Sequence, residues 1–109
     1  MDSLKEITAE IIKFSDDRDW SQFHNSKDLA VALSIESSEL LELFLWKGND
    51  DFNRDRLKEE LADVFMYALL LAEKNQLDIK EIIFDKIKKN NEKYPVEKAK
   101  GTAKKYNEL

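Results

Sequence analysis

The sequence predicts an all-α protein whose protomer is a four-helix bundle. The chain of 109 residues contains only two Gly and one Pro, too few for the many tight turns of a small β-sandwich or barrel. Four segments repeat apolar residues every three or four positions, which is the period of a buried helix face. Since one domain is the default at this length, we expect a helical domain over residues 1–95. A Lys-rich tail, residues 96–109, would belong to the same domain.

The first helix is expected to begin with the Ser3 and Glu6 pair, which has the spacing of a capping box. One buried face follows at three- and four-residue spacing: Leu4, Ile7, Ile11 and Phe14. The acidic stretch 16–19 ends this helix, and a loop over residues 20–25 follows it.

Ser26 is a good N-cap for a second helix, and Asp28 in the first turn is favoured by the helix dipole. Its apolar face consists of leucines: Leu29, Leu33, Leu40 and Leu43. Lys47 in the last turn and Gly48 just beyond it are typical of a helix C-terminus. We therefore expect this helix to extend to about residue 47.

The third helix is expected to be capped by Asp51 or Asn53 and to run to about Lys74. Residues 61–72 contain a single charge, Asp63, and are apolar nearly all round. A helix that is apolar on every side is buried on every side. Either the other three helices enclose it, or another copy of the chain covers it. We favour the second, because large exposed apolar patches are rare on monomers, and expect a homo-oligomer, either a dimer or a dimer of dimers.

The fourth helix is expected to open at the Asp78 and Glu81 pair and to stop before Tyr94, because Pro95 disfavours helix in the residue before it. Residues 96–109 have weak periodicity and are expected to form a tail or a short turn.

Composition excludes several kinds of site. The absence of Cys rules out disulfides, thiolate zinc sites and cysteine nucleophiles, and two Gly are too few for a phosphate-binding loop. Net charge is −5, with ten basic and twenty acidic residues in residues 1–85, and eight Lys against three Glu beyond. Such an acidic body argues against binding a nucleic acid polymer. Without a signal peptide or an apolar run of roughly 20 residues, we expect a cytoplasmic protein with no membrane partner.

Four acids occupy unusual positions. On a helical wheel Glu36 lies among the leucines of the second helix, and Glu39 lies one turn on at the edge of that stripe. Glu60 and Asp63 border the apolar row of the third helix. Because buried carboxylates need a partner, these two pairs predict a site for a hard divalent cation. Mg²⁺ fits best, with Mn²⁺ as a substitute. A di-iron bundle would need Glu-x-x-His on two helices, and the chain has one His.

Positive and amide side chains line one side of the fourth helix: Lys86, Asn90 and Lys93. Lysines on an apolar face commonly extend to water. Opposite four carboxylates and a cation, Lys86 would instead bind a phosphate as a point charge.

Aromatic residues near the acids form the last candidate group for substrate binding. Trp20, Phe23, Trp46 and Tyr67 offer flat faces that can stack a nucleobase, although each taken singly is more often a core residue. His24 is expected to be a hydrogen-bonding group of the core or of the pocket.

Together these residues resemble the MazG-like family of all-α nucleotide pyrophosphohydrolases. The resemblance rests on Glu36-Ser37-Ser38-Glu39 followed by Glu60-Leu61-Ala62-Asp63, a pattern of the form E-x-x-E and E-x-x-D. Further motifs resemble the branch that acts on dCTP: the segment from Arg18 to His24, residues 42–47, Lys93-Tyr94-Pro95 and Lys105-Tyr106.

The resemblance implies a helical bundle that forms dimers pairing into tetramers. It also implies cleavage of the α–β bond of a nucleoside triphosphate, dCTP or a modified dCTP, to the monophosphate and pyrophosphate. The Mg²⁺ ligands would be Glu36, Glu39, Glu60 and Asp63. Lys86 and Asn90 match positions of the family that contact the triphosphate. Trp20, Trp46 and Tyr67 match positions that surround the base and the sugar.

The catalytic hypothesis assigns three roles. Mg²⁺ neutralises the triphosphate and activates water, Glu39 or Glu36 orients or deprotonates that water, and Lys86 stabilises the leaving pyrophosphate. Three alternatives stay open: a helical interaction module whose acids pair with a partner's lysines, a nucleotide-binding regulator without turnover, and the same chemistry on dUTP or another non-canonical nucleotide.

Overall fold

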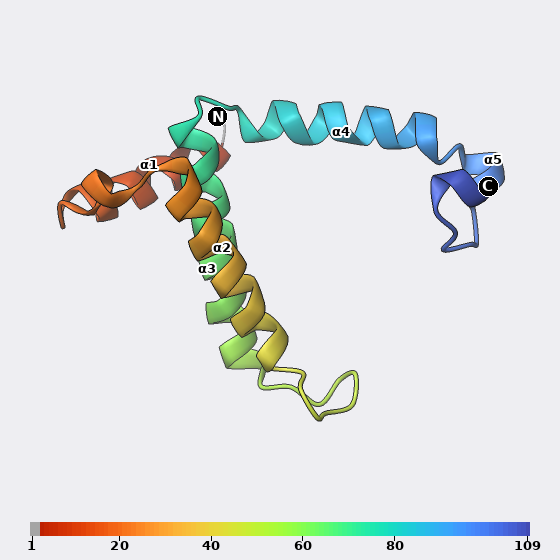
Figure 1. Ribbon diagram of the computed structural model, residues 1–109, viewed down its shortest axis with the longest axis horizontal. Coiled ribbons are helices and arrows are strands. Elements are labelled where there is room, and N and C mark those ends of the chain that lie inside the picture. The colour runs from red at the N-terminus through yellow and green to blue at the C-terminus, as the bar shows by residue number, and fades with distance from the viewer. Residues whose placement is uncertain (1–2) are drawn as a thin grey trace. The chain divides into compact units, whose positions relative to one another are not determined.

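The computed structural model describes residues 3–109, and every regular element in that range is helical (Figure 1). The all-α prediction is therefore confirmed. The elements are α1 (Ser3–Asp16), the 3-10 helix η1 (Trp20–Phe23), α2 (Ser26–Glu42), α3 (Arg54–Lys74), α4 (Ile79–Lys93), α5 (Val96–Ala99) and the 3-10 helix η2 (Tyr106–Glu108). They fall into two compact units, one ending at Leu77 and the other spanning Asp78–Leu109.

The first unit is an antiparallel hairpin of α2 and α3 with α1 packed against α3 (Figure 1). A hydrogen bond from Asn75 Nδ2 to Ser26 Oγ, 3.0 Å long, ties the end of α3 to the start of α2. The buried residues of this end come from all three helices: Ile11, Leu29, Leu69 and Ala72. This core fixes α1 against the hairpin and thereby places the aromatic turn η1 beside α3.

The N-cap of α2 is Asn25, and the prediction of Ser26 was wrong by one residue. Asn25 Oδ1 accepts a hydrogen bond of 2.8 Å from the backbone N–H of Asp28. Asn and Ser are comparable caps, so preference alone does not choose between them. The Ser26 hydroxyl is instead engaged with Asn75 across the hairpin, which leaves the capping position to Asn25.

We expect Asn25→Ala to lower the free energy of unfolding by about 1 kcal/mol, because an orphaned N–H of α2 loses its partner. Ser26→Ala removes an exposed side-chain hydrogen bond and should cost less than half as much. Urea unfolding of both variants measures the difference. Equal losses, or a larger loss for Ser26→Ala, would contradict the assignment of the cap.

Helix α2 ends at Glu42, earlier than the predicted stop near residue 47. Successive turns follow, and the left-handed residue in them is Trp46, with φ 63°, instead of Gly48. The rings of Phe44 and Phe52, 5.1 Å apart, pack across this connection. The Lys-Gly pair thus belongs to a loop, because contacts between aromatic side chains, and not C-cap chemistry, shape the end of α2.

The predicted caps of the next two helices are confirmed. Asn53 Oδ1 accepts from the backbone N–H groups of Asp55 and Arg56 at the start of α3. Asp78 Oδ1 accepts from the N–H of Glu81 at the start of α4. Both are short polar residues directly before a periodic apolar segment, which is the situation in which cap prediction works best.

The second unit consists of α4 and a C-terminal segment that folds beside its end. The Tyr94 and Tyr106 rings meet edge to face at 6.3 Å, and Lys93 Nζ lies 5.0 Å from the centre of the Tyr106 ring. Residues 96–109 thus contain two short helical turns, α5 and η2. A four-helix bundle, and a single domain over residues 1–95, stay predictions because the unit boundary falls at Leu77. No helix within residues 3–109 is long and apolar enough to cross a membrane.

Candidate metal and nucleotide site

Three of the four predicted acids converge between α2 and α3. Carboxylate oxygens of Glu36, Glu60 and Asp63 all lie within 4.8 Å of one another. The antiparallel hairpin explains this, because an E-x-x-(E/D) pair on each helix places two acids one turn apart on facing surfaces. Glu39 completes the set, since its carboxyl is close enough to both Glu36 and Glu60 to help raise their pKa values.

Two oxygens of this acidic cluster are buried without a partner. Glu36 Oε2 and Glu60 Oε2 are shielded from solvent, and neither has a hydrogen-bond partner among the described residues. The nearby cation is Arg56, whose guanidinium stands 4.0 Å from Glu60, the limit for an ion pair. Because the Arg56 side chain is itself well exposed, it contributes little and does not balance the charge of four acids.

Burial and mutual repulsion raise the pKa values of two of these acids, Glu36 and Glu60. Burial raises the pKa of the Glu36 carboxyl to about 7, and the hydrogen bond with Glu39 and the charges of Glu39, Asp63 and Glu60 add to the shift. Burial likewise raises the pKa of Glu60, with Glu39 next in importance. For Tyr67, burial raises the pKa of the phenol, and the charges of Glu36, Asp63 and Glu39 act in the same direction.

The donor set fits a hard divalent cation. Carboxylate oxygens are the ligands that Mg²⁺ and Mn²⁺ prefer, and three of them already stand within 4.8 Å of one another. A bound cation would give the orphaned oxygens of Glu36 and Glu60 a partner, and its charge would offset the burial and the repulsion that raise their pKa values. The four acids, with no compensating charge of their own, are therefore suited to hold such an ion.

Without metal, the protein should lose stability as pH rises from about 4.5 to about 7. A carboxyl whose pKa is raised on folding binds more protons in the folded state, so the free energy of unfolding falls through that window and levels off above it. Added Mg²⁺ binds the ionised carboxylates, so its stabilising effect should grow over the same window. Thermal unfolding across this range, in EDTA and in Mg²⁺, measures both trends.

Glu36→Gln is the control for this pH dependence, because it removes the carboxyl with the largest shift. Its metal-free stability should vary less with pH than that of the unsubstituted chain. A metal-free protein that becomes more stable between pH 4.5 and 7 would contradict the prediction.

An aromatic cavity adjoins the acidic cluster within the first unit. Its volume is about 250 Å³, and it is lined by Ile11, Phe14, Ser15, Trp20, His24, Asp63, Met66, Tyr67 and Leu70. Asp63 therefore belongs both to the acidic cluster and to the cavity wall. Tyr67 also lines the cavity, and the charges of the acids add to the burial that raises the pKa of its phenol. A ligand that reached the acids with one end would meet aromatic and apolar surfaces with the other.

Several predicted residues lie elsewhere. Phe23 is 63% exposed and Trp46 is fully exposed, and neither is among the residues that line the cavity. Lys86, Asn90 and Lys93 belong to α4 in the second unit, which is described by itself. Their contact with a triphosphate stays a prediction.

The prediction missed cavity residues that do not look functional in isolation. Ser15 is buried, with 3% exposed, and lines the cavity together with Met66 and Leu70. One signal was present, since Ser15 follows Ile11 by four positions and so puts a hydroxyl on the apolar face of α1. Met66 and Leu70 carry no such signal, because they have the apolar character expected of helix core.

Comparison with known proteins adds to this geometry. Residues 31–109, which include all four acids, match the model of the MazG-like family. The dCTP pyrophosphatase 1 proteins of Mus musculus and Homo sapiens are each 36% identical over 115 residues, covering 98% of this chain and 68% of their own length. The crystal structure of a pyrophosphatase from Archaeoglobus fulgidus has a TM-score of 0.81 at 34% identity, covering 87% of this chain and 94% of that one.

Proposed function

This chain belongs to the MazG-like family, and from that premise we propose that it is a Mg²⁺-dependent nucleotide pyrophosphohydrolase. The observation that carries the proposal is the cluster of Glu36, Glu60 and Asp63, with two orphaned carboxylate oxygens, beside an aromatic cavity. The substrate is a (deoxy)nucleoside triphosphate, and dCTP or a modified dCTP is favoured because the curated relatives are named for dCTP. The products are the nucleoside monophosphate and pyrophosphate.

In this proposal some of the acids bind the metal ion and one accepts a proton. Glu36, Glu60 and Asp63, whose oxygens converge, would hold the cation, with Glu39 beside them. Bound Mg²⁺ supplies charge neutralisation of the triphosphate and a lowered pKa for the attacking water. Glu39 lies outside the trio of convergent oxygens yet interacts with Glu36 and Glu60, so it is the best candidate to orient the water and take its proton.

Bond making and breaking follow from these roles. The water oxygen bonds to the α-phosphorus, its proton passes to Glu39, and the bond between the α-phosphorus and the α–β bridging oxygen breaks. Pyrophosphate leaves with the bridging oxygen. Lys86 would stabilise the negative charge on it as a point charge, and Asn90 and Lys93 would bind the remaining phosphate oxygens.

The base would enter the aromatic cavity. Trp20 and Tyr67 offer ring faces there, and His24 offers a hydrogen-bonding group. Trp46 and Phe23, being exposed, are available to close over the base or sugar from outside the cavity. The cavity volume of about 250 Å³ suits a small flat ring and not an extended polymer.

The working molecule is proposed to be a homo-oligomer, a dimer or a dimer of dimers. Each unit by itself leaves large apolar side chains exposed: Val31, Ile35, Leu41, Leu61 and Phe65 in the first, and Ile82, Ile83, Phe84 and Ile87 in the second. Surfaces of this kind mark association sites. Light scattering at micromolar concentration should give a mass of at least two chains, and a monomer would overturn this part of the proposal.

A nucleotide panel tests the proposed reaction. Canonical deoxynucleoside and ribonucleoside triphosphates, 5-methyl-dCTP and dUTP are each incubated with Mg²⁺, with Mn²⁺ and with EDTA, and monophosphate and pyrophosphate are quantified. We expect equal amounts of the two products, with dCTP or 5-methyl-dCTP turned over fastest and no turnover in EDTA. Release of inorganic phosphate in place of pyrophosphate would show that a different bond is cleaved.

Calorimetry separates the remaining alternatives. Mg²⁺-dependent nucleotide binding without any product would identify a nucleotide-binding regulator. Absence of both nucleotide binding and metal-dependent stabilisation would identify a helical interaction module. Fastest turnover of dUTP would keep the chemistry and change the substrate.

A further inference from the structure

We infer that Arg18 is a positioning residue that holds Trp20 in the wall of the aromatic cavity and so sets the affinity for the nucleobase. The inference rests on the proposed function, in which the cavity receives the base. It concerns a residue that does not itself line the cavity. Arg18 must therefore act through the two rings that it touches, Phe14 and Trp20, both of which line it.

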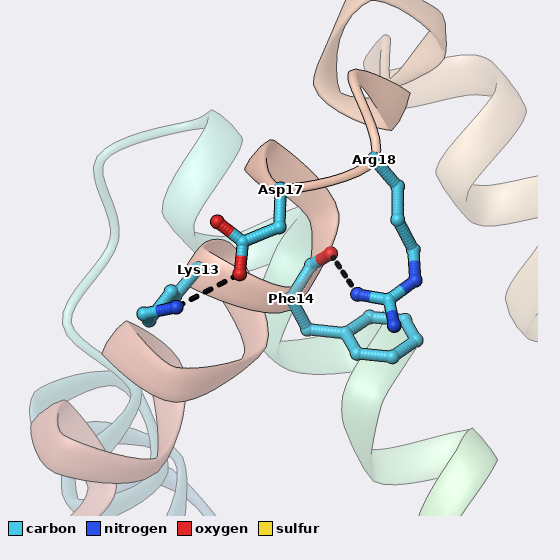
Figure 2. A network of polar contacts seen from close by, with 4 residues as sticks. All are labelled: Lys13, Phe14, Asp17 and Arg18. Atoms are coloured by element: carbon cyan, nitrogen blue, oxygen red, sulfur yellow. Dashed lines mark hydrogen bonds and ion pairs between the residues drawn. The ribbon is translucent and has the colours of Figure 1, made fainter.

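The guanidinium of Arg18 is fixed on the Phe14 ring (Figure 2). Its Cζ atom lies 3.9 Å from the centre of that ring, and Nη1 donates a hydrogen bond of 3.0 Å to the Phe14 carbonyl oxygen. The same Cζ atom lies 6.0 Å from the Trp20 ring, which meets Phe14 edge to face at 5.6 Å. Arg18 thus stacks directly on Phe14 and lies at the outer limit of cation–π distance from the centre of the Trp20 ring, so it interacts with both members of the ring pair that forms this wall.

The charge of Arg18 is directed to rings and not to acids. The neighbouring carboxylate, Asp17, is taken by Lys13 in an ion pair of 2.8 Å (Figure 2). No described carboxylate forms an ion pair with Arg18. A guanidinium suits this place better than an ammonium, because its plane stacks on an aromatic face while its N–H groups remain free to donate.

The backbone of the aromatic turn has its own supports. The Ser21 hydroxyl donates to Asp16 Oδ1, and Gln22 Nε2 donates to the Asp19 carbonyl at 2.8 Å. Asp19 itself takes the left-handed conformation, with φ 55°, which Asp tolerates better than most residues. Because these bonds hold the turn without Arg18, Arg18 adds its hydrogen bond to the Phe14 carbonyl and its contacts with the two rings, which orient the Trp20 side chain.

Orientation matters because Trp20 is 46% exposed and so has room to adopt other rotamers. A side chain that is mobile before binding must be ordered by the ligand, which weakens affinity. Removing Arg18 should therefore raise KM about three- to tenfold, while kcat changes less than about twofold, because the acids that perform the chemistry are untouched.

The kinetic test compares Arg18→Ala and Arg18→Lys with a matched control, Lys5→Ala. The control also removes one positive charge, from an exposed position near the start of α1, more than two helical turns before Phe14. Arg18→Ala should show the full rise in KM for the best triphosphate, Arg18→Lys an intermediate rise, and Lys5→Ala none. An unchanged KM for Arg18→Ala, or a fall in kcat without a rise in KM, would overturn the inference.

A second readout needs neither nucleotide nor metal. The chain has two Trp, so a Trp46→Phe background leaves Trp20 as the sole tryptophan emitter. There Arg18→Ala should shift Trp20 emission to the red and increase its quenching by iodide, whereas Lys5→Ala should change neither. Identical Trp20 spectra would overturn the inference even if the chain hydrolyses nucleotides. Changed spectra in a chain that hydrolyses none would uphold the contact and defeat the proposed function.

Discussion

Asp63→Asn is expected to lower the rate of pyrophosphate release by at least about 100-fold, because it removes a charged oxygen ligand from the acidic cluster. Asp63 has the largest expected effect of the four acids, since it belongs to the trio of convergent carboxylates and also lines the aromatic cavity. Loss of the Asp63 carboxylate would weaken binding of the cation. It would also alter the part of the cavity wall that lies beside the acidic cluster. Steady-state assays of pyrophosphate under saturating Mg²⁺ measure the effect.

The same substitution should stabilise the metal-free fold. Glu36 and Glu60 each have a raised pKa to which the charge of Asp63 contributes, so neutralising Asp63 relieves repulsion at pH values where the acids are ionised. We expect the Tm in EDTA to rise and the Tm gain on adding Mg²⁺ to shrink. An inactive variant that is stabilised cannot owe its inactivity to misfolding.

Glu59→Gln is the matched control for this experiment. Glu59 is next to Glu60 in the sequence but exposed on the outer side of α3, so it changes net charge by the same amount outside the cluster. It should leave turnover and the Mg²⁺-dependent Tm gain unchanged. Loss of activity in Glu59→Gln, or wild-type turnover in Asp63→Asn, would contradict the assignment of the metal ligands.

The acidic cluster could be predicted from the sequence because a charged residue type occupies a position where an apolar residue is expected. Glu36 occupies the leucine face of α2, where a carboxylate is costly unless something binds it. That conflict is local, so a helical wheel reveals it. The convergence with Glu60 and Asp63 required one further assumption, that α2 and α3 form an antiparallel hairpin. The predicted connection after residue 47 is short, which favours a hairpin, and the hairpin forms although the observed connection, residues 43–53, is longer.

The aromatic cavity and the loop after α2 could be predicted less well from the sequence. The cavity exists because α1 packs against α3, and its Met66 and Leu70 lining follows from that tertiary contact and from no local pattern. Ser15 is different, because its hydroxyl on the apolar face of α1 was a local signal. The end of α2 was misplaced because the Lys-Gly pair is a local signal for a helix C-terminus, whereas the packing of Phe44 on Phe52 is a tertiary contact that no local pattern reveals. The N-cap was misplaced by one residue because two good capping residues, Asn25 and Ser26, stand side by side.

Trp46 carries the second large prediction, because its backbone and its side chain are both unfavourable in the single chain. It adopts φ 63°, a left-handed conformation that costs a residue with a Cβ about 1–2 kcal/mol. Its side chain is fully exposed, so no packing within the described chain offsets that cost. Strained residues of this kind are typical of ligand contacts, and an indole in this state is available to stack on a nucleobase.

Trp46→Gly and Trp46→Ala are expected to raise KM for the triphosphate about tenfold or more, since stacking on an aromatic residue contributes about 1–3 kcal/mol per base. Trp46→Phe keeps a stacking face and should retain most of the affinity. The two truncations differ in stability. Gly relieves the left-handed strain, whereas Ala keeps it, so the Tm of Trp46→Gly should equal or exceed that of Trp46→Ala.

The changes in Tm and in KM together show whether the exposed indole of Trp46 contacts the substrate or another copy of the chain. A residue kept for substrate alone can be truncated to Gly with little loss of Tm and a large loss of affinity. A Tm that falls by several degrees in both truncations, and falls more at high protein concentration where copies associate, would instead mean that the indole is buried between copies of the chain. In that event Trp46 would stabilise the oligomer, and the base would depend on Trp20 and Tyr67 for its aromatic contacts.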